Sequence, residues 1–137
     1  MNGPSPHLTW RELACKDGTP YPIRWRTTRA AELAAAFEAL RLLVGKPLVV
    51  LSAYRTPAHN VAVGGARWSQ HVEGRALDLR PPKGWSVTRL ADLAKLIPEI
   101  QGIGYYPTFL HIDVRPTERR ATWHGGRPAA DSATVKR

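Results

Sequence analysis

The chain has 137 residues, of which 43% are hydrophobic and 23% are charged, as is typical of one globular domain with its own core. Its net charge of +9 lies mainly in the two ends, because residues 31–114 carry nine Lys/Arg against seven Asp/Glu. These values exclude wholesale disorder, and no apolar run approaches the roughly 20 residues of a membrane-spanning helix.

The N-terminal segment, "MNGPSPHLTWREL", has no apolar stretch of the kind that a signal peptide requires, so we expect synthesis in the cytoplasm without one. Thr9 followed three positions later by Glu12 is the pattern of a capping box, which predicts a short helix. Cys15 is the single cysteine, which excludes an internal disulfide and a multi-cysteine zinc cluster. We expect it to be a partly buried free thiol and any metal to be held by nitrogen and oxygen.

The next segments predict a helix, a strand and a loop. A helix is expected over about 28–44, because apolar residues recur there at spacings of three and four and Gly45 can end it. These apolar residues are Leu33, Phe37, Leu40 and Val44. The segment "PLVVLSAYR" (47–55) has the β-branched apolar density of a buried strand. The glycine-rich stretch 56–68 predicts an irregular connection with one helical turn.

The second half of the chain predicts three further strands and a helix. Segments 75–80 and 109–114 alternate polar and apolar residues, and "GIGYY" (102–106) is a further short strand. A helix is predicted over 86–100, with Pro98 stopping it. Because helices and strands are mixed without a regular βαβ alternation, we expect an α+β fold with a small, mostly antiparallel sheet flanked by helices.

The alternation also sorts polar side chains onto one face of that sheet. In the first alternating strand the two leucines share a face and leave Asp78 on the other. In the second, the aliphatic residues leave His111 and Asp113 on the face opposite to the core. His71 lies at the mouth of the first strand. Two histidines and a carboxylate can therefore converge on one sheet face.

Such a set suits zinc. Zn²⁺ binds imidazole nitrogen and carboxylate oxygen, and a catalytic zinc site keeps three protein ligands and a water molecule. His71, Asp78 and His111 supply three ligands of these types. The pKa of a water molecule on zinc falls to roughly 7, so hydroxide becomes available at neutral pH.

Three ordered motifs resemble those of one known family. The segment "SQHVEGRALD" fits the signature S-x-H-x-x-G-x-A-x-D of the D-Ala-D-Ala metallopeptidases, the M15-type peptidases related to the hedgehog zinc domain. The matching residues are Ser69, His71, Gly74, Ala76 and Asp78. Upstream, "LSAYRTPAHNVAVGGA" resembles the family's "SGYRSPAHNRAVGGA" segment. Downstream, "GIGYYPTFLHIDV" is similar to the "GVGYYP…FVHVD" segment of its murein-endopeptidase-like branch.

The resemblance covers about residues 8–115, and the lead-in "LTWRELACKDG" looks like that of many phage and prophage members. It implies one zinc peptidase domain over 1–137, with a hedgehog/DD-peptidase-like α+β fold and a basic C-terminal tail over 116–137. It also implies one Zn²⁺ with His71, Asp78 and His111 as ligands.

Further site residues follow from the same resemblance. Arg55 matches an arginine that in relatives holds a substrate carboxylate or the polarised carbonyl oxygen, and a guanidinium suits either task. Ser69, a fixed residue of the signature, is a candidate for substrate binding. His124 is a further candidate, as a substrate or proton-transfer residue. Tyr105 is a substrate-binding candidate as well, although the aromatic residues Trp68, Tyr105 and Tyr106 can equally pack in the core.

The general base is less clear from the motifs. Several relatives place a glutamate three residues before the last histidine ligand, but Thr108 occupies that position here. Asp113 fits the "HxD" pattern of the endopeptidase-like branch instead. It either takes a proton from zinc-bound water or orients a ligand from behind, and the sequence leaves both roles open.

The sequence thus predicts a zinc metallopeptidase that hydrolyses peptidoglycan peptides, as a D,D-carboxypeptidase or as a murein endopeptidase of the endolysin type. Without a signal peptide, phage-mediated release to the cell wall suits it, and we expect a monomer. The alternative is a non-catalytic zinc-containing cell-wall-binding or phage structural domain on the same fold. A nucleic-acid-binding module has only the charge in its favour, so we expect no specific nucleic-acid partner.

Overall fold

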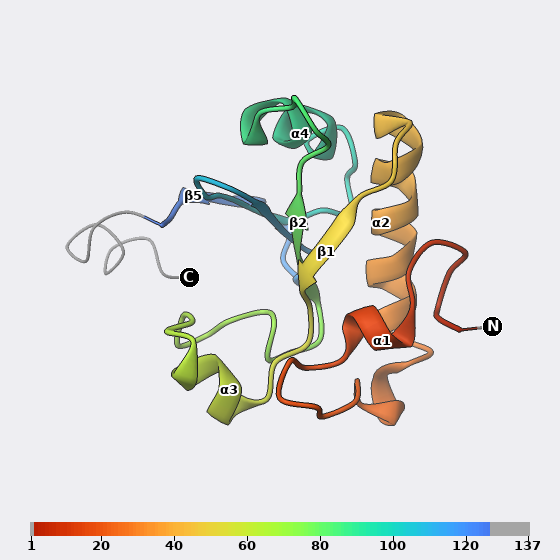
Figure 1. The fold of residues 1–137 in the computed structure, drawn as a ribbon, viewed down its shortest axis with the longest axis vertical. Coiled ribbons are helices and arrows are strands. Elements are labelled where there is room, and N and C mark those ends of the chain that lie inside the picture. The colour runs from red at the N-terminus through yellow and green to blue at the C-terminus, as the bar shows by residue number, and fades with distance from the viewer. Residues whose placement is uncertain (1, 127–137) are drawn as a thin grey trace.

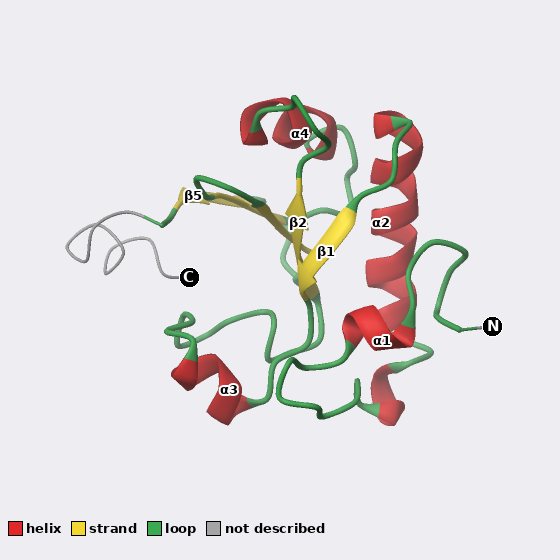
Figure 2. Ribbon diagram, in the orientation of Figure 1, coloured by secondary structure: helices red, strands yellow, loops and turns green. Residues whose placement is uncertain are grey.

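The computed structural model describes residues 2–126 as a mixed sheet with helices around it (Figures 1 and 2). The elements in chain order are α1 (Trp10–Leu13), a 3₁₀ turn (Ile23–Trp25), α2 (Arg29–Val44), β1 (Val49–Ser52), α3 (Pro57–Ala62), β2 (Ala76–Arg80), α4 (Val87–Ala94), β3 (Gly102–Tyr105), β4 (Leu110–Asp113) and β5 (Ala121–His124). Among the described residues, no helix is long and apolar enough to cross a membrane.

The five strands form one sheet in the order β1-β2-β4-β3-β5. Every neighbouring pair is antiparallel except β3 and β5, which run parallel. The fold is therefore α+β with a mostly antiparallel sheet, as the sequence predicts. In Figure 1, α4 and the C-terminal end of α2 lie at one end of β1 and β2, and α3 lies at the other.

The hydrophobic core joins α2 and α4 to the apolar face of the sheet. Leu77 and Leu79 of β2 are fully buried, as are Leu110 and Ile112 of β4. They pack in one cluster with the apolar residues of α2. Burying a leucine fully contributes about 1.5–3 kcal/mol, so this pattern fixes which face of each strand turns away from the core.

Local signals at the helix ends act as predicted. Glu12 N–H donates to Thr9 Oγ1 at 3.0 Å and Thr9 N–H donates to Glu12 Oε1 at 2.9 Å, which completes the capping box of α1. Helix α2 ends at Val44, and Gly45 follows with a φ of +73° in the left-handed region. Both predictions are confirmed.

Helix α4 ends at Ala94 and is therefore shorter than the predicted span of 86–100. The following turn is tied to the start of β5 by one side chain, Arg120. Its guanidinium donates to the carbonyl oxygens of Lys95, Ile97 and Ile100 at 2.8–3.0 Å. These hydrogen bonds satisfy carbonyls that a continuing helix would have bonded internally.

The C-terminal part differs from the expected tail over 116–137. Residues 121–124 form β5, with Gly102 opposite Ala121 and Gly104 opposite Trp123. The predicted tail beyond Gly126 lies outside the described residues. The sheet therefore gains an edge strand that the sequence did not predict, and this strand carries Trp123 toward the polar face.

Candidate metal centre

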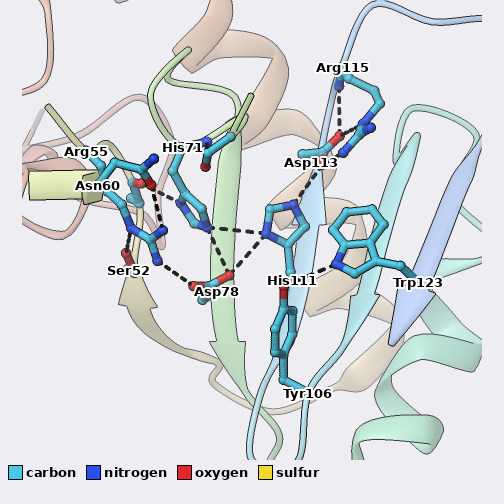
Figure 3. Close-up of polar contacts among 12 residues, drawn as sticks. Ser52, Arg55, Asn60, His71, Asp78, Tyr106, His111, Asp113, Arg115 and Trp123 are labelled. Atoms are coloured by element: carbon cyan, nitrogen blue, oxygen red, sulfur yellow. Dashed lines mark hydrogen bonds and ion pairs between the residues drawn. The ribbon is translucent and has the colours of Figure 1, made fainter. Parts of the chain in front are cut away.

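Two paired strands and the turn before them bring three candidate ligands together. Asp78 of β2 lies directly opposite His111 of β4, so the two side chains share a face of the sheet. His71 comes from the turn that precedes β2. Asp78 Oδ1 lies 3.0 Å from His71 Nε2 and 3.2 Å from His111 Nδ1, and the two ring nitrogens are 3.2 Å apart (Figure 3). All three side chains are buried.

The outer nitrogen of each imidazole fixes where its proton lies. His71 Nδ1 is 2.6 Å from the carbonyl oxygen of Ala53, so this nitrogen carries the proton and donates it. His111 Nε2 is 2.7 Å from Asp113 Oδ2 and donates in the same way. The inner nitrogens, His71 Nε2 and His111 Nδ1, therefore carry the lone pairs of the neutral imidazoles. With both imidazoles neutral, these two nitrogens and the Asp78 carboxylate are three acceptors that face one another.

Three buried acceptors in contact require a cation, because unpaired polar atoms in a protein interior are costly. Zinc meets nitrogen and carboxylate oxygen ligands at roughly 2.0–2.2 Å, so two ligands of a tetrahedral site lie roughly 3.3 Å apart. The observed separations of 3.0–3.2 Å are close to that value. The residues present thus fit one zinc ion, with His71, Asp78 and His111 as a tripod.

The pKa values of the three side chains in the metal-free protein also indicate that this site favours a positive charge. Burial lowers the pKa of His71 despite the nearby carboxylate. Burial disfavours ionisation of Asp78 as well, but the two imidazoles outweigh it and hold its pKa well below the usual range. Burial opposes protonation of His111 too, yet the hydrogen bonds to Asp113 and Asp78 raise its pKa from 6.5 to about 9. In the metal-free protein, a proton on His111 takes the place of the cation.

This proton makes zinc binding dependent on pH. Because the pKa of His111 is raised to about 9, the metal-free site holds a proton at neutral pH that zinc has to displace. We expect the apparent affinity for zinc to rise about tenfold per pH unit up to about pH 9 and to level off above it. Calorimetric titrations of zinc in buffers of different protonation enthalpy measure the protons released. An affinity that does not change with pH would contradict this assignment.

The triad opens into a cavity. The residues that line it are Arg55, Val63, Gly64, Gly65, Ala66, Ser69, Gln70, His71, Asp78, Tyr106, Phe109, His111, Trp123, Gly125 and Gly126. They come from the sheet, from the segments after β1, α3 and β5, and from the loop between β3 and β4. Among these lining residues, Asp78 is the only one with a carboxylate.

Arg55 forms one wall of the cavity beside the carboxylate of the triad. Its Nη2 donates to Asp78 Oδ2 at 3.3 Å, its Nη1 to Asn60 Oδ1 at 3.2 Å, and its Nε to Ser52 Oγ at 3.3 Å. Asn60 is itself buried and donates to the carbonyl oxygen of Ala66 at 2.9 Å. Figure 3 shows the guanidinium held between Asn60 and Asp78. The predicted arginine therefore lies where a substrate entering the cavity would meet it.

Tyr106 and Trp123 form the opposite wall. Trp123 Nε1 donates to Tyr106 Oη at 3.1 Å, and the Trp123 ring lies 5.0 Å from the His111 ring between centroids. Gly104 makes room for this ring, because a Cβ there would lie 2.7 Å from the indole. The sequence left Tyr106 undecided between cleft and core and gave Trp123 no role. The two closely spaced glycines of "GIG" were the available signal that a neighbouring side chain crosses this strand.

Asp113 lies behind His111, on the side away from the cavity. It is fully buried, and a Cβ at its partner Gly102 would collide with its carboxylate. Arg115 grips both of its oxygens, with Nε donating to Oδ1 and Nη2 donating to Oδ2, each at 2.8 Å. Burial disfavours its ionisation, but Arg115 and His111 hold its pKa well below the usual range. Of the two roles that the sequence left open, this geometry favours orienting His111.

The other predicted substrate residues lie around the cavity in different ways. Ser69 lines it, and its hydroxyl accepts from the backbone N–H of His71 at 3.1 Å. Tyr105 and His124 stack on each other, 4.7 Å between ring centroids, and line a neighbouring hollow together with Tyr106. Trp68 is largely exposed and lines neither. Ser69 therefore lines the same cavity as the triad, whereas Tyr105 and His124 line the neighbouring hollow.

Comparison with known proteins agrees with this geometry. A family model described as Peptidase M15 matches residues 6–113, which is well over half of the chain. No curated protein matches the sequence. The matched range contains the triad, Arg55 and Asp113. The chain belongs to the peptidase M15 family.

Proposed function

We propose that this protein is a zinc-dependent peptidase that hydrolyses peptide bonds of bacterial peptidoglycan. The observation that carries the proposal is the convergence of three candidate ligand atoms, 3.0–3.2 Å apart, at the wall of a cavity that also holds an arginine. Membership of the peptidase M15 family supports peptide hydrolysis. The motif resemblance over residues 8–115 supports zinc as the metal and peptidoglycan as the substrate.

Arg55 has the properties needed to hold the reacting group. When bound at the triad, zinc supplies a Lewis acid and lowers the pKa of water toward neutrality. The guanidinium offers several N–H donors in a planar fork and is fixed by Asn60 and Asp78. In this position it binds a substrate carboxylate or the oxygen on which negative charge develops during hydrolysis.

Tyr106 is suited to donate a second hydrogen bond across the cavity. Burial raises the pKa of its hydroxyl, so the group stays protonated at neutral pH and cannot serve as the base. Trp123 Nε1 already donates to the oxygen, which leaves the hydroxyl proton for another acceptor. We assign Tyr106 to orienting a substrate carbonyl or carboxylate.

Asp113 is proposed to fix the tautomer and the ring orientation of His111. Asp113→Asn is then expected to weaken zinc binding about 10–100-fold, because the partner of His111 Nε2 loses its charge. Competition with a chromophoric chelator measures this change. The kcat of the fully loaded variant should fall far less.

Asp92→Asn is the matched control, because Asp92 is an exposed aspartate on α4 that pairs with Lys95 at the surface. A base has a different signature: an unchanged zinc affinity with a kcat lowered by about 10²–10⁴-fold. That pattern in Asp113→Asn would overturn the orienting role.

The proposed function is tested by digestion of purified murein. Zinc-loaded protein should release soluble peptide products, a chelator should stop the release, and added zinc should restore it. Mass spectra of the products identify the bond: free D-alanine indicates a D,D-carboxypeptidase, and loss of cross-linked dimers indicates an endopeptidase. Zinc-loaded protein that binds murein and leaves every peptide bond intact would instead favour a non-catalytic cell-wall-binding or phage structural domain.

The remaining proposals concern the fold family, the oligomeric state and the place where the protein acts. The arrangement of the sheet and the triad is consistent with a hedgehog/DD-peptidase-like fold. We propose that a monomer acts at the bacterial cell wall, as a phage or prophage lysis enzyme would. The excess positive charge of the two ends would hold it to an anionic wall, and high salt should weaken this contact.

A further inference from the structure

A second group of side chains with metal-binding atoms lies outside the triad. Cys15 and Asp17 come from the loop after α1, and His59 comes from the first turn of α3. One ligand atom from each residue lies within 4.8 Å of the other two. Two segments that are far apart in the sequence thus meet at a thiol, a carboxylate and an imidazole.

The loop that carries Cys15 and Asp17 is held in shape by its own hydrogen bonds. Cys15 N–H donates to the carbonyl oxygen of Thr19 at 2.8 Å, and Gly18 N–H donates to that of Cys15 at 3.0 Å. Thr19 N–H donates to Asp17 Oδ1 at 2.9 Å. Gly18 has a φ of +96°, which lets the chain turn directly after Asp17 and bring Thr19 back to Cys15. Both ligand residues are therefore positioned without any metal.

Thr56 connects this loop to the third candidate ligand. Its hydroxyl donates to Asp17 Oδ2 at 2.8 Å and accepts from the backbone N–H of His59 at 3.1 Å as the N-cap of α3. Thr19 N–H donates to one carboxylate oxygen of Asp17 and the Thr56 hydroxyl to the other, and a bound metal would use a further lone pair of either oxygen. Within residues 2–126, the imidazole of His59 makes no hydrogen bond.

The charges at this cluster also suit a divalent cation. The Asp17 carboxylate accepts hydrogen bonds from the backbone N–H of Thr19 and from the hydroxyl of Thr56. Cys15 is a buried free thiol. A thiolate and a carboxylate together carry two negative charges, and thiolate with imidazole is a donor pair typical of zinc.

We propose that Cys15, Asp17 and His59 form a second site for Zn²⁺ or a similar thiophilic divalent cation, which ties the loop after α1 to α3. Around a tetrahedral zinc ion these ligand atoms would lie roughly 3.3–3.8 Å apart. Because the ligand atoms lie within 4.8 Å of one another, binding requires a closure of at most about 1 Å. This proposal departs from the expectation, drawn from the sequence, that any metal is held by nitrogen and oxygen alone.

Occupation of the second site has a consequence for the cavity. Helix α3 also carries Asn60, whose side chain holds Arg55 Nη1 at 3.2 Å. A metal that fixes the first turn of α3 therefore also restrains the wall on which Arg55 lies. This second site stands independently of the proposed peptidase activity.

Cobalt(II) distinguishes the two sites, because Cys15 is the only cysteine and the triad has no sulfur. The metal-free chain titrated with Co²⁺ should bind two equivalents and develop a near-ultraviolet sulfur-to-cobalt charge-transfer band. The band should be lost in Cys15→Ala and in His59→Ala. It should persist in His71→Ala, which removes a triad ligand, and in His7→Ala, which alters a histidine bound to Glu38.

The outcomes separate this proposal from the proposed function. A band in His71→Ala together with no murein digestion by the wild type supports the second site and overturns the peptidase. If the wild type digests murein, binds one equivalent of Co²⁺ and shows no band, the peptidase is supported and the second site is overturned. A band that survives in folded His59→Ala, checked by circular dichroism, also overturns the site, since His59 would then be no ligand.

Discussion

Replacement of His71 by alanine is expected to remove one zinc ion per chain and to lower the rate of murein peptide hydrolysis at least about 10³-fold. The triad offers three ligand atoms within 3.2 Å, and two of them cannot hold zinc tightly in competition with a proton on His111. A metal ion in such a site supplies several kcal/mol of charge stabilisation, and this is lost with it. Elemental analysis of protein prepared without added zinc measures the first effect, and product release from murein measures the second.

His7→Ala is the matched control for this substitution. His7 lies far outside the cavity, with its ring bound to the carboxylate of Glu38 at 2.8 Å. We expect its zinc content and its activity to equal those of the wild type. If His71→Ala keeps the full zinc content and the full activity, the triad is not the metal centre of the enzyme.

Replacement of Arg55 is expected to have the second largest effect. Arg55→Ala should lower kcat/KM by about 10²–10³-fold, the usual range for removing one donor to a developing oxyanion. Arg55→Lys should recover only part of the loss, because an ammonium group keeps the charge but cannot reach Asn60, Asp78 and the substrate with a planar fork. Steady-state kinetics on a defined murein peptide measure both variants.

The division of this loss between kcat and KM identifies what Arg55 binds. A rise in KM with kcat unchanged indicates a carboxylate held equally in the ground state and the transition state, and a fall in kcat indicates the developing oxyanion. Arg80→Ala is the control, because Arg80 is an exposed arginine on the same strand as Asp78 and does not line the cavity. Unchanged kinetics in both Arg55 variants would exclude Arg55 from the site.

The alternation of the two strands predicts which face of the sheet carries Asp78 and His111. Because leucines at 77 and 79 must face the core, Asp78 has to face away from it, and the same argument applies to His111 in β4. The sequence could not show that the two residues lie directly opposite each other. Register depends on loop lengths and pairing, which a single strand does not encode.

The role of Asp113 shows a different limit. Its position two residues after His111 predicts that the two share a face, and they are in contact. Which imidazole nitrogen receives the carboxylate depends on the rotation of the ring, and no spacing rule contains that information. The space left by Gly102 and the grip of Arg115 place the carboxylate behind the ring.

Strand β5 was missed for a physical reason as well. It has four residues, and its pairing with β3 is parallel and not the continuation of a hairpin. What fixes its start is Arg120, whose guanidinium bonds three carbonyl oxygens around the end of α4. An arginine in a basic stretch gives no sign in the sequence that its partners are backbone atoms some twenty residues away.

Strand β5 contributes to a part of the cavity wall that lies after the triad in the sequence. Every triad residue precedes Asp113, where the family match ends, whereas Trp123, Gly125 and Gly126 complete the far wall of the cavity. The three candidate ligands and the residues of this far wall therefore lie in separate segments of the chain. We expect that a few substitutions after residue 120 would change which peptides fit the cavity and would leave β2 and β4, which carry Asp78 and His111, unaltered.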